Sequence, residues 1–239
     1  MGNHSFGKGL VQNTYDIGYN SKVKLTTAKY YIPSGRCVQA LNYKDGKAIE
    51  VADSSRKAFF TKAGRTVYDG KGLEPDIQIQ EEKEILIVKE LIKNHRIFNF
   101  ANQFRVDHDS IVEAREFQLS EAEYQAFVNS NQSWWSNFET KSEKELKKLM
   151  EQSKLDQSYE ASKPRFDKIL ETLRENKLKD FETHTKAIKK AIEQEIVSRY
   201  YYYTGKVEHR LASDTYILRS IELFSNKESY DRILKSPEK

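Results

Sequence analysis

The sequence predicts an α+β protein, with a short-stranded mixed β subdomain over residues 1–82 and a mostly α-helical domain over residues 83–239. Nine of the ten glycines lie at or before Gly72. The same part of the chain carries β-branched and aromatic runs broken by turn residues, a pattern typical of short strands. After Glu81, apolar residues recur at helical spacing instead. The change in pattern places the domain boundary near residue 82.

The first part contains several strand candidates. Residues 23–32 (VKLTTAKYYI) are the clearest, and Pro33, Ser34 and Gly35 then suit a type I turn. Residues 36–43 could return as a second strand. The stretch 44–57 has no clear periodicity and is predicted to be a surface insertion. Three shorter strands are predicted at residues 59–61, 65–68 and 77–80.

The second part is predicted to be helical from its start. Apolar residues in 84–93 fall on one stripe, and Ser120 with Glu123 forms a capping-box pattern that opens a short helix to about Val128. Ser142 can cap a further helix that carries Leu146 on its apolar face. We interpret the stripes mainly as core-packing faces.

The longest predicted helix has Pro164 in its first turn, a position that proline tolerates. The apolar stripe thins near residues 177–185, where we expect a break. Gly205 is expected to end this helix as a C-terminal glycine. A coiled-coil partner surface is the alternative to core packing, but the stripe does not hold a strict seven-residue repeat over three heptads.

Composition excludes several classes of protein. No run approaches the roughly 18 apolar residues that a membrane span needs. The single cysteine, Cys37, excludes an internal disulfide framework and a thiolate metal cluster. The five histidines stand far apart in sequence, so we expect no metal site and no cofactor. With 40 basic and 36 acidic residues, the net charge of +4 gives no support to nucleic-acid binding.

A run of four tyrosines, residues 200–203, raises the possibility of a base-stacking surface. Successive helical side chains turn by about 100°, so four neighbours point in nearly every direction and cannot form one platform. We favour an arrangement in which two rings are buried in the core and two hydroxyls reach water.

One N-terminal lysine has an unusual setting. Lys8 stands between Gly7 and Gly9, where the backbone can bend sharply. It could be a solvated surface lysine. It could also pair with Ser5 in a Ser-x-x-Lys arrangement, but that pairing needs a helix, which the glycines disfavour, and its usual companion motifs are missing.

A third interpretation rests on resemblance. The run Phe6-Gly7-Lys8-Gly9-Leu10-Val11-Gln12 resembles the lysine motif of the C-terminal processing (tail-specific) serine proteases. The resemblance continues through residues 24–36 (KLTTAKYYIPSGR) and again through residues 70–77 (GKGLEPDI). Residues 83–239 are similar to the long helical C-terminal extension of one bacterial branch of that family.

The resemblance implies a crotonase-like catalytic core in which a serine attacks the peptide carbonyl and a lysine accepts its proton. By motif, that lysine is Lys8, and Gln12 helps to orient it. The serine of such enzymes lies about 25 residues before the lysine, whereas seven residues precede Lys8 here. We therefore expect the C-terminal portion of a protease whose nucleophile lies upstream, and we expect this chain alone to be inactive.

The predicted chemistry makes physical demands on the lysine. An amine with an ordinary pKa near 10.4 is a poor base at neutral pH, so it must be desolvated, for example beneath Phe6. Gln12 can accept a hydrogen bond from the amine without adding charge. Residues four apart on a regular strand lie about 13 Å from each other, so the chain must bend at Gly7 or Gly9 for the two side chains to meet.

The resemblance also implies protein or peptide substrates and a location in the cell envelope or periplasm. An incomplete core would leave exposed strand edges, so self-association through those edges or through the helices is expected. The alternative function is a helical interaction or oligomerisation module of an envelope complex with no activity of its own.

Overall fold

The structure, a computed structural model, describes residues 1–80 and 83–235 and falls into two compact units. Residues 1–82 together with 214–239 form the β unit, and residues 83–213 form the helical unit. The predicted α+β fold class is confirmed. The predicted boundary at residue 82 lies at residues outside the described part, so the division into domains stays a prediction.

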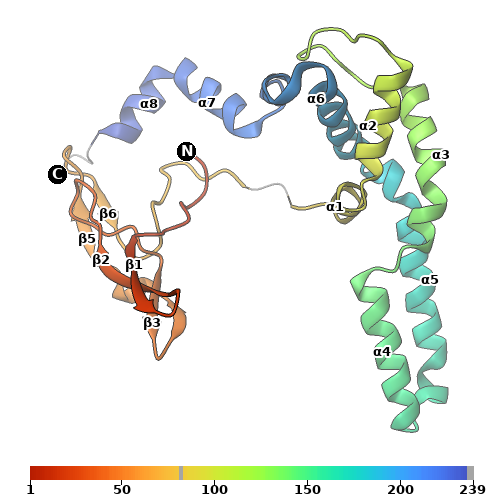
Figure 1. The fold of residues 1–239 in the computed structure, drawn as a ribbon, viewed down its shortest axis with the longest axis horizontal. Helices are drawn as coiled ribbons and strands as arrows, with labels where there is room; N and C mark the ends of the chain where they lie inside the picture. The colour runs from red at the N-terminus through yellow and green to blue at the C-terminus, as the bar shows by residue number, and fades with distance from the viewer. Residues whose placement is uncertain (81–82, 236–239) are drawn as a thin grey trace. The chain divides into compact units, whose positions relative to one another are not determined.

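Within the described residues, the β unit contains three two-stranded antiparallel sheets, in the red-to-orange part of the ribbon in Figure 1. They are β1 (Leu10–Gly18) with β2 (Ser21–Lys29), β3 (Leu41–Lys44) with β4 (Lys47–Glu50), and β5 (Ala58–Phe60) with β6 (Thr66–Tyr68). A short 3₁₀ turn, η1 (Asp53–Ser55), follows β4. Two helices of the same unit, α7 (Thr215–Ser225) and α8 (Lys227–Leu234), come from the C-terminal end of the chain.

Some strand predictions are wrong. Residues 77–80 form no strand, and only an isolated parallel bridge joins Gln78 to Gly2. The supposed insertion at 44–57 contains most of the β3–β4 hairpin, whose turn residues Asp45 and Gly46 both have positive φ. An Asp-Gly pair is a strong hairpin signal because both residues tolerate that conformation. The predicted return strand at 36–43 is a strand only from Leu41 onward.

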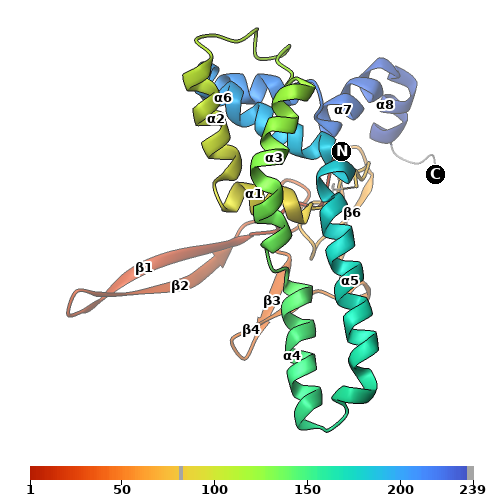
Figure 2. The same cartoon turned by 90° about the vertical axis from the view of Figure 1, so that its right-hand side faces the viewer.

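The longest sheet is the β1–β2 hairpin, a narrow ribbon in Figure 2. Its turn residues Tyr19 and Asn20 both have positive φ, which suits the twist of a two-residue hairpin loop. One face carries polar pairs such as Thr14 opposite Lys24. The other face is apolar and partly exposed, and we call it the apolar hairpin face; it comprises Val11, Tyr15, Ile17, Val23 and Leu25.

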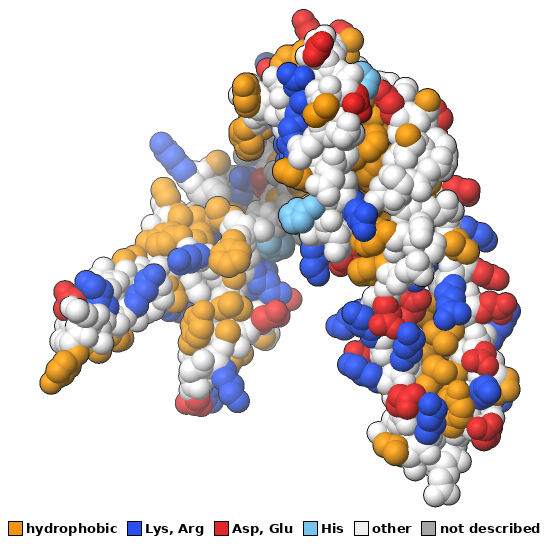
Figure 3. Space-filling view, turned by 45° about the vertical axis from the view of Figure 1, so that its right-hand side comes forward, with side chains coloured by type: hydrophobic (Ala, Val, Ile, Leu, Met, Phe, Trp, Pro, Cys, Tyr) orange, Lys and Arg blue, Asp and Glu red, His pale blue; other side chains and the backbone are white. Residues whose placement is uncertain are grey.

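The helical unit consists of six helices around one hydrophobic core. The helices are α1 (Leu86–Lys93), α2 (Arg96–Asp107), α3 (Glu121–Asn137), α4 (Lys141–Leu155), α5 (Tyr159–Thr183) and α6 (Thr185–Leu211). The largest fully buried side chains of this core are those of Ile87, Leu91, Phe127, Trp135, Ile188, Ile192, Ile196 and Val197. Figure 3 shows hydrophobic side chains along the seam between α4 and α5, flanked by charged ones. The apolar stripes therefore serve mainly as core faces.

The helix boundaries correct three predictions. The Ser120–Glu123 capping box is confirmed, although α3 continues to Asn137. The cap of α4 is Thr140 rather than Ser142, because Thr140 and Glu143 form the same reciprocal capping box. Pro164 lies inside α5, which begins five residues earlier at Tyr159.

The break near residues 177–185 is confirmed, since α5 ends at Thr183 and α6 begins at Thr185. Gly205 does not end α6, which runs to Leu211. Instead the helix is kinked at Tyr202, whose φ of 56° and ψ of −153° are non-helical. A Cβ atom added at Gly205 would lie 2.1 Å from the Cβ of Tyr201. The kink at Tyr202 therefore leaves no room for a side chain at position 205, which accounts for the glycine there.

The four tyrosines do not form one surface. Tyr200 packs against the core and donates a 2.6 Å hydrogen bond to the carbonyl of His108. Tyr201 is more exposed, and its hydroxyl lies 3.2 Å from the carbonyl oxygens of Ile111 and Val112. The expectation of two buried rings is met only in part: Tyr200 is half-buried against the core, whereas Tyr201 is 38% exposed and Tyr202 and Tyr203 are each 79% exposed.

A charged pair is buried in the helical unit. The Nζ of Lys177 lies 3.0 and 3.2 Å from the two carboxylate oxygens of Glu143 and 2.6 Å from the carbonyl of Phe138. The two charged side chains are only 6% and 7% exposed. Trp135 is buried beside them and donates its indole N–H to the backbone carbonyl of Lys177, 3.1 Å away. The three donors of the ammonium group thus have acceptors, as a buried charge requires.

Candidate active-site lysine segment

The lysine segment, residues 6–12, lies against the stretch 37–40 in the β unit. The carbonyl of Gly7 accepts a 2.8 Å hydrogen bond from the N–H of Ala40. The N–H of Gly9 donates to the Oε1 of Gln39, also at 2.8 Å. The peptide groups on both sides of the lysine are therefore held from the same neighbouring stretch.

Tyr30 holds the segment from its other side. Its backbone N–H donates to the carbonyl of Gly9 at 3.1 Å, and its side-chain hydroxyl donates to the carbonyl of Lys8. Together with Ala40 and Gln39, this residue fixes the backbone at four points within three residues. Such a backbone is well suited to present one side chain in a defined position.

The two glycines beside the lysine are required by this close packing. A Cβ atom at Gly7 would lie 2.3 Å from the Cβ of Ala40, and the φ of Gly7 is 73°, which disfavours any side chain. A Cβ atom at Gly9 would lie 2.8 Å from the backbone nitrogen of Gln39. The structure thus gives the glycines a steric role that the sequence pattern did not indicate.

The side chains of Lys8 and Gln12 are both exposed. Gln12 lies on the polar face of the β1–β2 hairpin, opposite Thr26. Among the described residues, no hydrogen bond joins Gln12 to Lys8. Phe6 is 89% exposed, so it does not supply the apolar cover that we expected for the amine. The roles of Lys8 and Gln12 stay predictions.

The Ser-x-x-Lys alternative has no support in the geometry. The hydroxyl of Ser5 accepts a 2.7 Å hydrogen bond from the N–H of Leu73, and the N–H of Ser5 donates to the carbonyl of Leu73 at 2.9 Å. A Cβ atom at Gly72 would lie 2.3 Å from the carbonyl oxygen of Ser5. Ser5, which directly precedes the lysine segment, is therefore bonded to the stretch 70–77 and not to Lys8.

These contacts bring the three sequence motifs together. The stretch 70–77 is bonded to Ser5, the residue directly before the lysine segment, and the stretch 24–36 is bonded to the segment through Tyr30. Tyr30 lies within the motif at residues 24–36, so the resemblance could have pointed to it as a functional candidate. Gln39 lies in residues 36–43, which the sequence pattern predicted to be a return strand, and no motif pointed to it.

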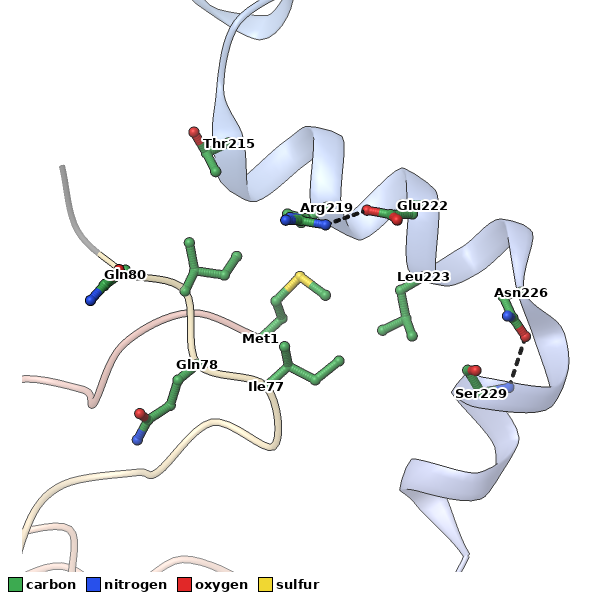
Figure 4. Close-up of a pocket in the computed structure, with 11 residues that line it drawn as sticks. Met1, Ile77, Gln78, Gln80, Thr215, Arg219, Glu222, Leu223, Asn226 and Ser229 are labelled. Atoms are coloured by element: carbon green, nitrogen blue, oxygen red, sulfur yellow. Dashed lines mark hydrogen bonds and ion pairs between the residues drawn. The ribbon is translucent and has the colours of Figure 1, made fainter.

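A hollow of about 480 Å³ lies elsewhere in the β unit, between the extended stretch 77–80 and α7–α8 (Figure 4). Met1 and Leu223 extend into it, and an Arg219–Glu222 ion pair of 2.8 Å lies on its helical side. It includes neither Lys8 nor Gln12. The lysine segment is therefore a surface segment rather than part of this hollow.

Two general properties complete the site description. Within residues 1–80 and 83–235, no three His, Cys, Asp or Glu side chains gather closely enough to bind a metal ion. In the same residues, no helix is both long and apolar enough to cross a membrane.

Comparison with known proteins identifies two families that match this chain. The family described as "Probable PDZ-protease, C-terminal helical domain" matches residues 87–224, which is more than half of the chain. The chain belongs to this family. Peptidase family S41 matches residues 1–46, a stretch that contains the whole lysine segment. The resemblance to C-terminal processing proteases is thereby confirmed.

A curated relative extends the comparison. The chain is 42% identical over 50 residues to the carboxy-terminal-processing protease of Bartonella bacilliformis. Those residues make up 21% of this chain and only 12% of that protein, so the chain matches about an eighth of the length of this relative. No solved structure is significantly similar.

Proposed function

We propose that this chain is part of a serine-type endopeptidase that cleaves proteins near their C-termini. The observation that carries the proposal is the position of Lys8 and Gln12 inside the stretch that matches peptidase family S41. The relative named as a carboxy-terminal-processing protease supports the same class of reaction. In this proposal the nucleophilic serine lies about 25 residues before Lys8, outside these 239 residues.

Three groups take part in the proposed reaction: the upstream serine, Lys8 and Gln12. The serine oxygen attacks the carbonyl carbon of the scissile peptide bond as its proton passes to the Nζ of Lys8. The protonated lysine can then give that proton to the departing amine, so that the same amine serves as base and acid. Gln12 orients the amine through its side-chain oxygen and places no charge beside it.

The exposed position of Lys8 defines what the rest of the enzyme must supply. An amine in water stays protonated at neutral pH and cannot accept the serine proton. The upstream part of the peptidase, which carries the serine, would therefore also cover this amine and exclude water from it. The same cover would bring the serine within hydrogen-bond distance of Nζ.

Labelling with a fluorophosphonate probe, which reacts with activated serines, tests the proposal. The 239-residue chain should not label, because a base without its nucleophile has nothing to deprotonate. A longer chain that begins before the serine should label, and Lys8→Ala in that chain should abolish labelling. Gln12→Ala should reduce labelling less, since orienting a base contributes less than supplying one.

Two results would oppose the assignment. Labelling of the 239-residue chain would return Ser5 as a candidate nucleophile. Equal labelling of the longer chain with and without Lys8→Ala would show that another group is the base. Lys62→Ala, at a lysine in the same unit but outside the three motifs, is the matched control and should leave labelling unchanged.

Location and assembly belong to the same proposal. We place the enzyme in the cell envelope or periplasm by its relationship to C-terminal processing proteases. Among the described residues, both long strands of the β1–β2 hairpin have one edge with no neighbouring strand, and one face of the hairpin is apolar. Unpaired strand edges favour association with a second copy of the chain.

A further inference from the structure

We infer that Gln39 and Tyr30 are positioning residues for the lysine base. The inference rests on the proposed function, because it assigns a role to the hydrogen bonds around Lys8. It starts from the absence of side chains at Gly7 and Gly9, which leaves the peptide groups beside the lysine accessible to partners from neighbouring stretches.

Gln39 bridges the lysine segment to the beginning of β3. Its Oε1 accepts the N–H of Gly9 at 2.8 Å, and its Nε2 donates to the carbonyl of Leu41 at 2.9 Å. Both ends of the amide group are thus engaged, which fixes its orientation. Because the N–H of Gly9 follows Lys8 directly in the chain, this bond sets the plane of the peptide that leaves the lysine.

Tyr30 acts on the peptide group between Lys8 and Gly9. Its hydroxyl donates to the carbonyl of Lys8, while the backbone N–H of the same residue donates to the carbonyl of Gly9. One peptide unit is therefore bonded at both ends. Its carbonyl, that of Lys8, accepts from the Tyr30 hydroxyl, and its N–H, that of Gly9, donates to Gln39. Hydrogen bonds at both ends of a peptide unit restrain its rotation about the flanking Cα bonds.

This arrangement matters for catalysis because the lysine side chain is long. Four methylene groups separate Nζ from Cα, so a small rotation of the backbone moves the amine by a large distance. A displacement of about 1 Å between reacting groups can cost about 10²-fold in rate. The backbone of Lys8 is held by the side chains of Gln39 and Tyr30. Loss of either side chain should therefore displace the lysine amine.

The direct test is amide hydrogen exchange in the 239-residue chain. Gln39→Leu removes the acceptor at nearly constant volume, so the exchange of the Gly9 amide should accelerate at least tenfold. The amides of β1 and β2 should exchange as before, which shows that the hairpin is still folded. Unchanged exchange at Gly9 in a folded variant would overturn the assignment of Gln39.

The second test measures peptidase kinetics in the longer chain that carries the serine. Gln39→Leu should lower kcat about 10²-fold and Tyr30→Phe about tenfold, each with KM changed less than twofold, because both side chains are assigned to the backbone of Lys8 and Gly9 and neither to the substrate. Tyr31→Phe and Gln78→Leu are matched controls at exposed positions and should leave kcat unchanged. A rise in KM at constant kcat, or no change in either, would overturn the inference.

A double variant separates positioning from a general structural effect. If Gln39 acts through Lys8, Gln39→Leu should add little to the loss that Lys8→Ala causes, whereas independent effects would multiply. A full multiplicative loss would overturn the inference. Failure of the proposed function is distinguishable, because Lys8→Ala alone would then leave the rate unchanged whatever the exchange at Gly9 shows.

Discussion

Replacement of Lys177 by methionine should strongly destabilise the helical unit. The ammonium group lies 3.0 Å from a carboxylate oxygen of Glu143, and both side chains are almost fully buried. Without the lysine, the carboxylate and the carbonyl of Phe138 lose their buried partner. Removing one partner of such a pair typically costs about 3–5 kcal/mol of the free energy of unfolding, because an uncompensated charge remains inside.

Tryptophan fluorescence during urea unfolding measures this loss. Both tryptophans of the chain, Trp134 and Trp135, lie in the helical unit, and Trp135 donates to the backbone of Lys177. The signal therefore reports the unit in which the change is made. A unit of this size should also melt about 10–20 °C lower for a loss of that magnitude.

The matched control lies on the same helix. Lys168→Met breaks an exposed pair with Glu171, in which the two side chains are 74% and 59% exposed, and should cost less than about 1 kcal/mol. Adding Glu143→Gln to Lys177→Met should recover part of the loss, since glutamine keeps the capping box and removes the charge. Equal destabilisation by Lys177→Met and Lys168→Met would refute the reasoning.

Three further predictions use simpler changes. Gly205→Ala should destabilise the helical unit by about 1–3 kcal/mol in urea unfolding although alanine favours helices, because the new Cβ would lie 2.1 Å from that of Tyr201; a gain in stability would contradict the kinked geometry. Burial alone raises the pKa of Glu143, but hydrogen bonds from Thr140 and Lys177 outweigh it and lower the pKa below its ordinary value of 4.5. The stability that Glu143 contributes is therefore present above about pH 4.5 and lost as the pH falls through the lowered pKa, so the difference in urea midpoint between wild type and Glu143→Gln should shrink in acid. Finally, light scattering should show association of the 239-residue chain that is abolished by combining Tyr15→Lys with Leu25→Lys on the apolar hairpin face; a wild-type monomer at high concentration would count against self-association.

The helical part of the fold was predictable because its signals are local. A capping box such as Ser120 with Glu123 operates within one turn, and the thinning of the stripe before His184 marks a real helix end. The cap of α4 was mispredicted because two local signals competed. Thr140 and Ser142 are both good caps, and only the reciprocal bond with Glu143 decides between them.

The β part was less predictable, because pairing depends on residues distant in the sequence. Residues 77–80 have the composition of a strand, yet in the described part of the chain their only β-bridge is the one from Gln78 to Gly2. The Asp45-Gly46 turn, by contrast, is a local signal for the β3–β4 hairpin. Most of the strands also lack an alternating pattern of buried and exposed residues that would distinguish them from loops in the sequence. The sheets are two-stranded, and most of their side chains are exposed.

The candidate site was predictable as a motif but not as a geometry. The lysine and its two glycines were found from sequence, whereas the bonds from Gln39 and Tyr30 come from stretches about 30 and 20 residues away. Steric reasons for a glycine cannot be derived from its own sequence neighbours. They depend on Ala40 and Gln39, which the fold brings alongside.

The kink in α6 makes the energetic effects of substitutions at positions 202 and 205 depend on each other. Tyr202 has a backbone conformation that glycine adopts readily and tyrosine adopts at a cost of about 1–3 kcal/mol. The same conformation brings Tyr201 against Gly205, where no side chain fits. A substitution at one position therefore changes which residues the other position tolerates. A straight helix would tolerate alanine at position 205, whereas the kinked helix would favour glycine at position 202.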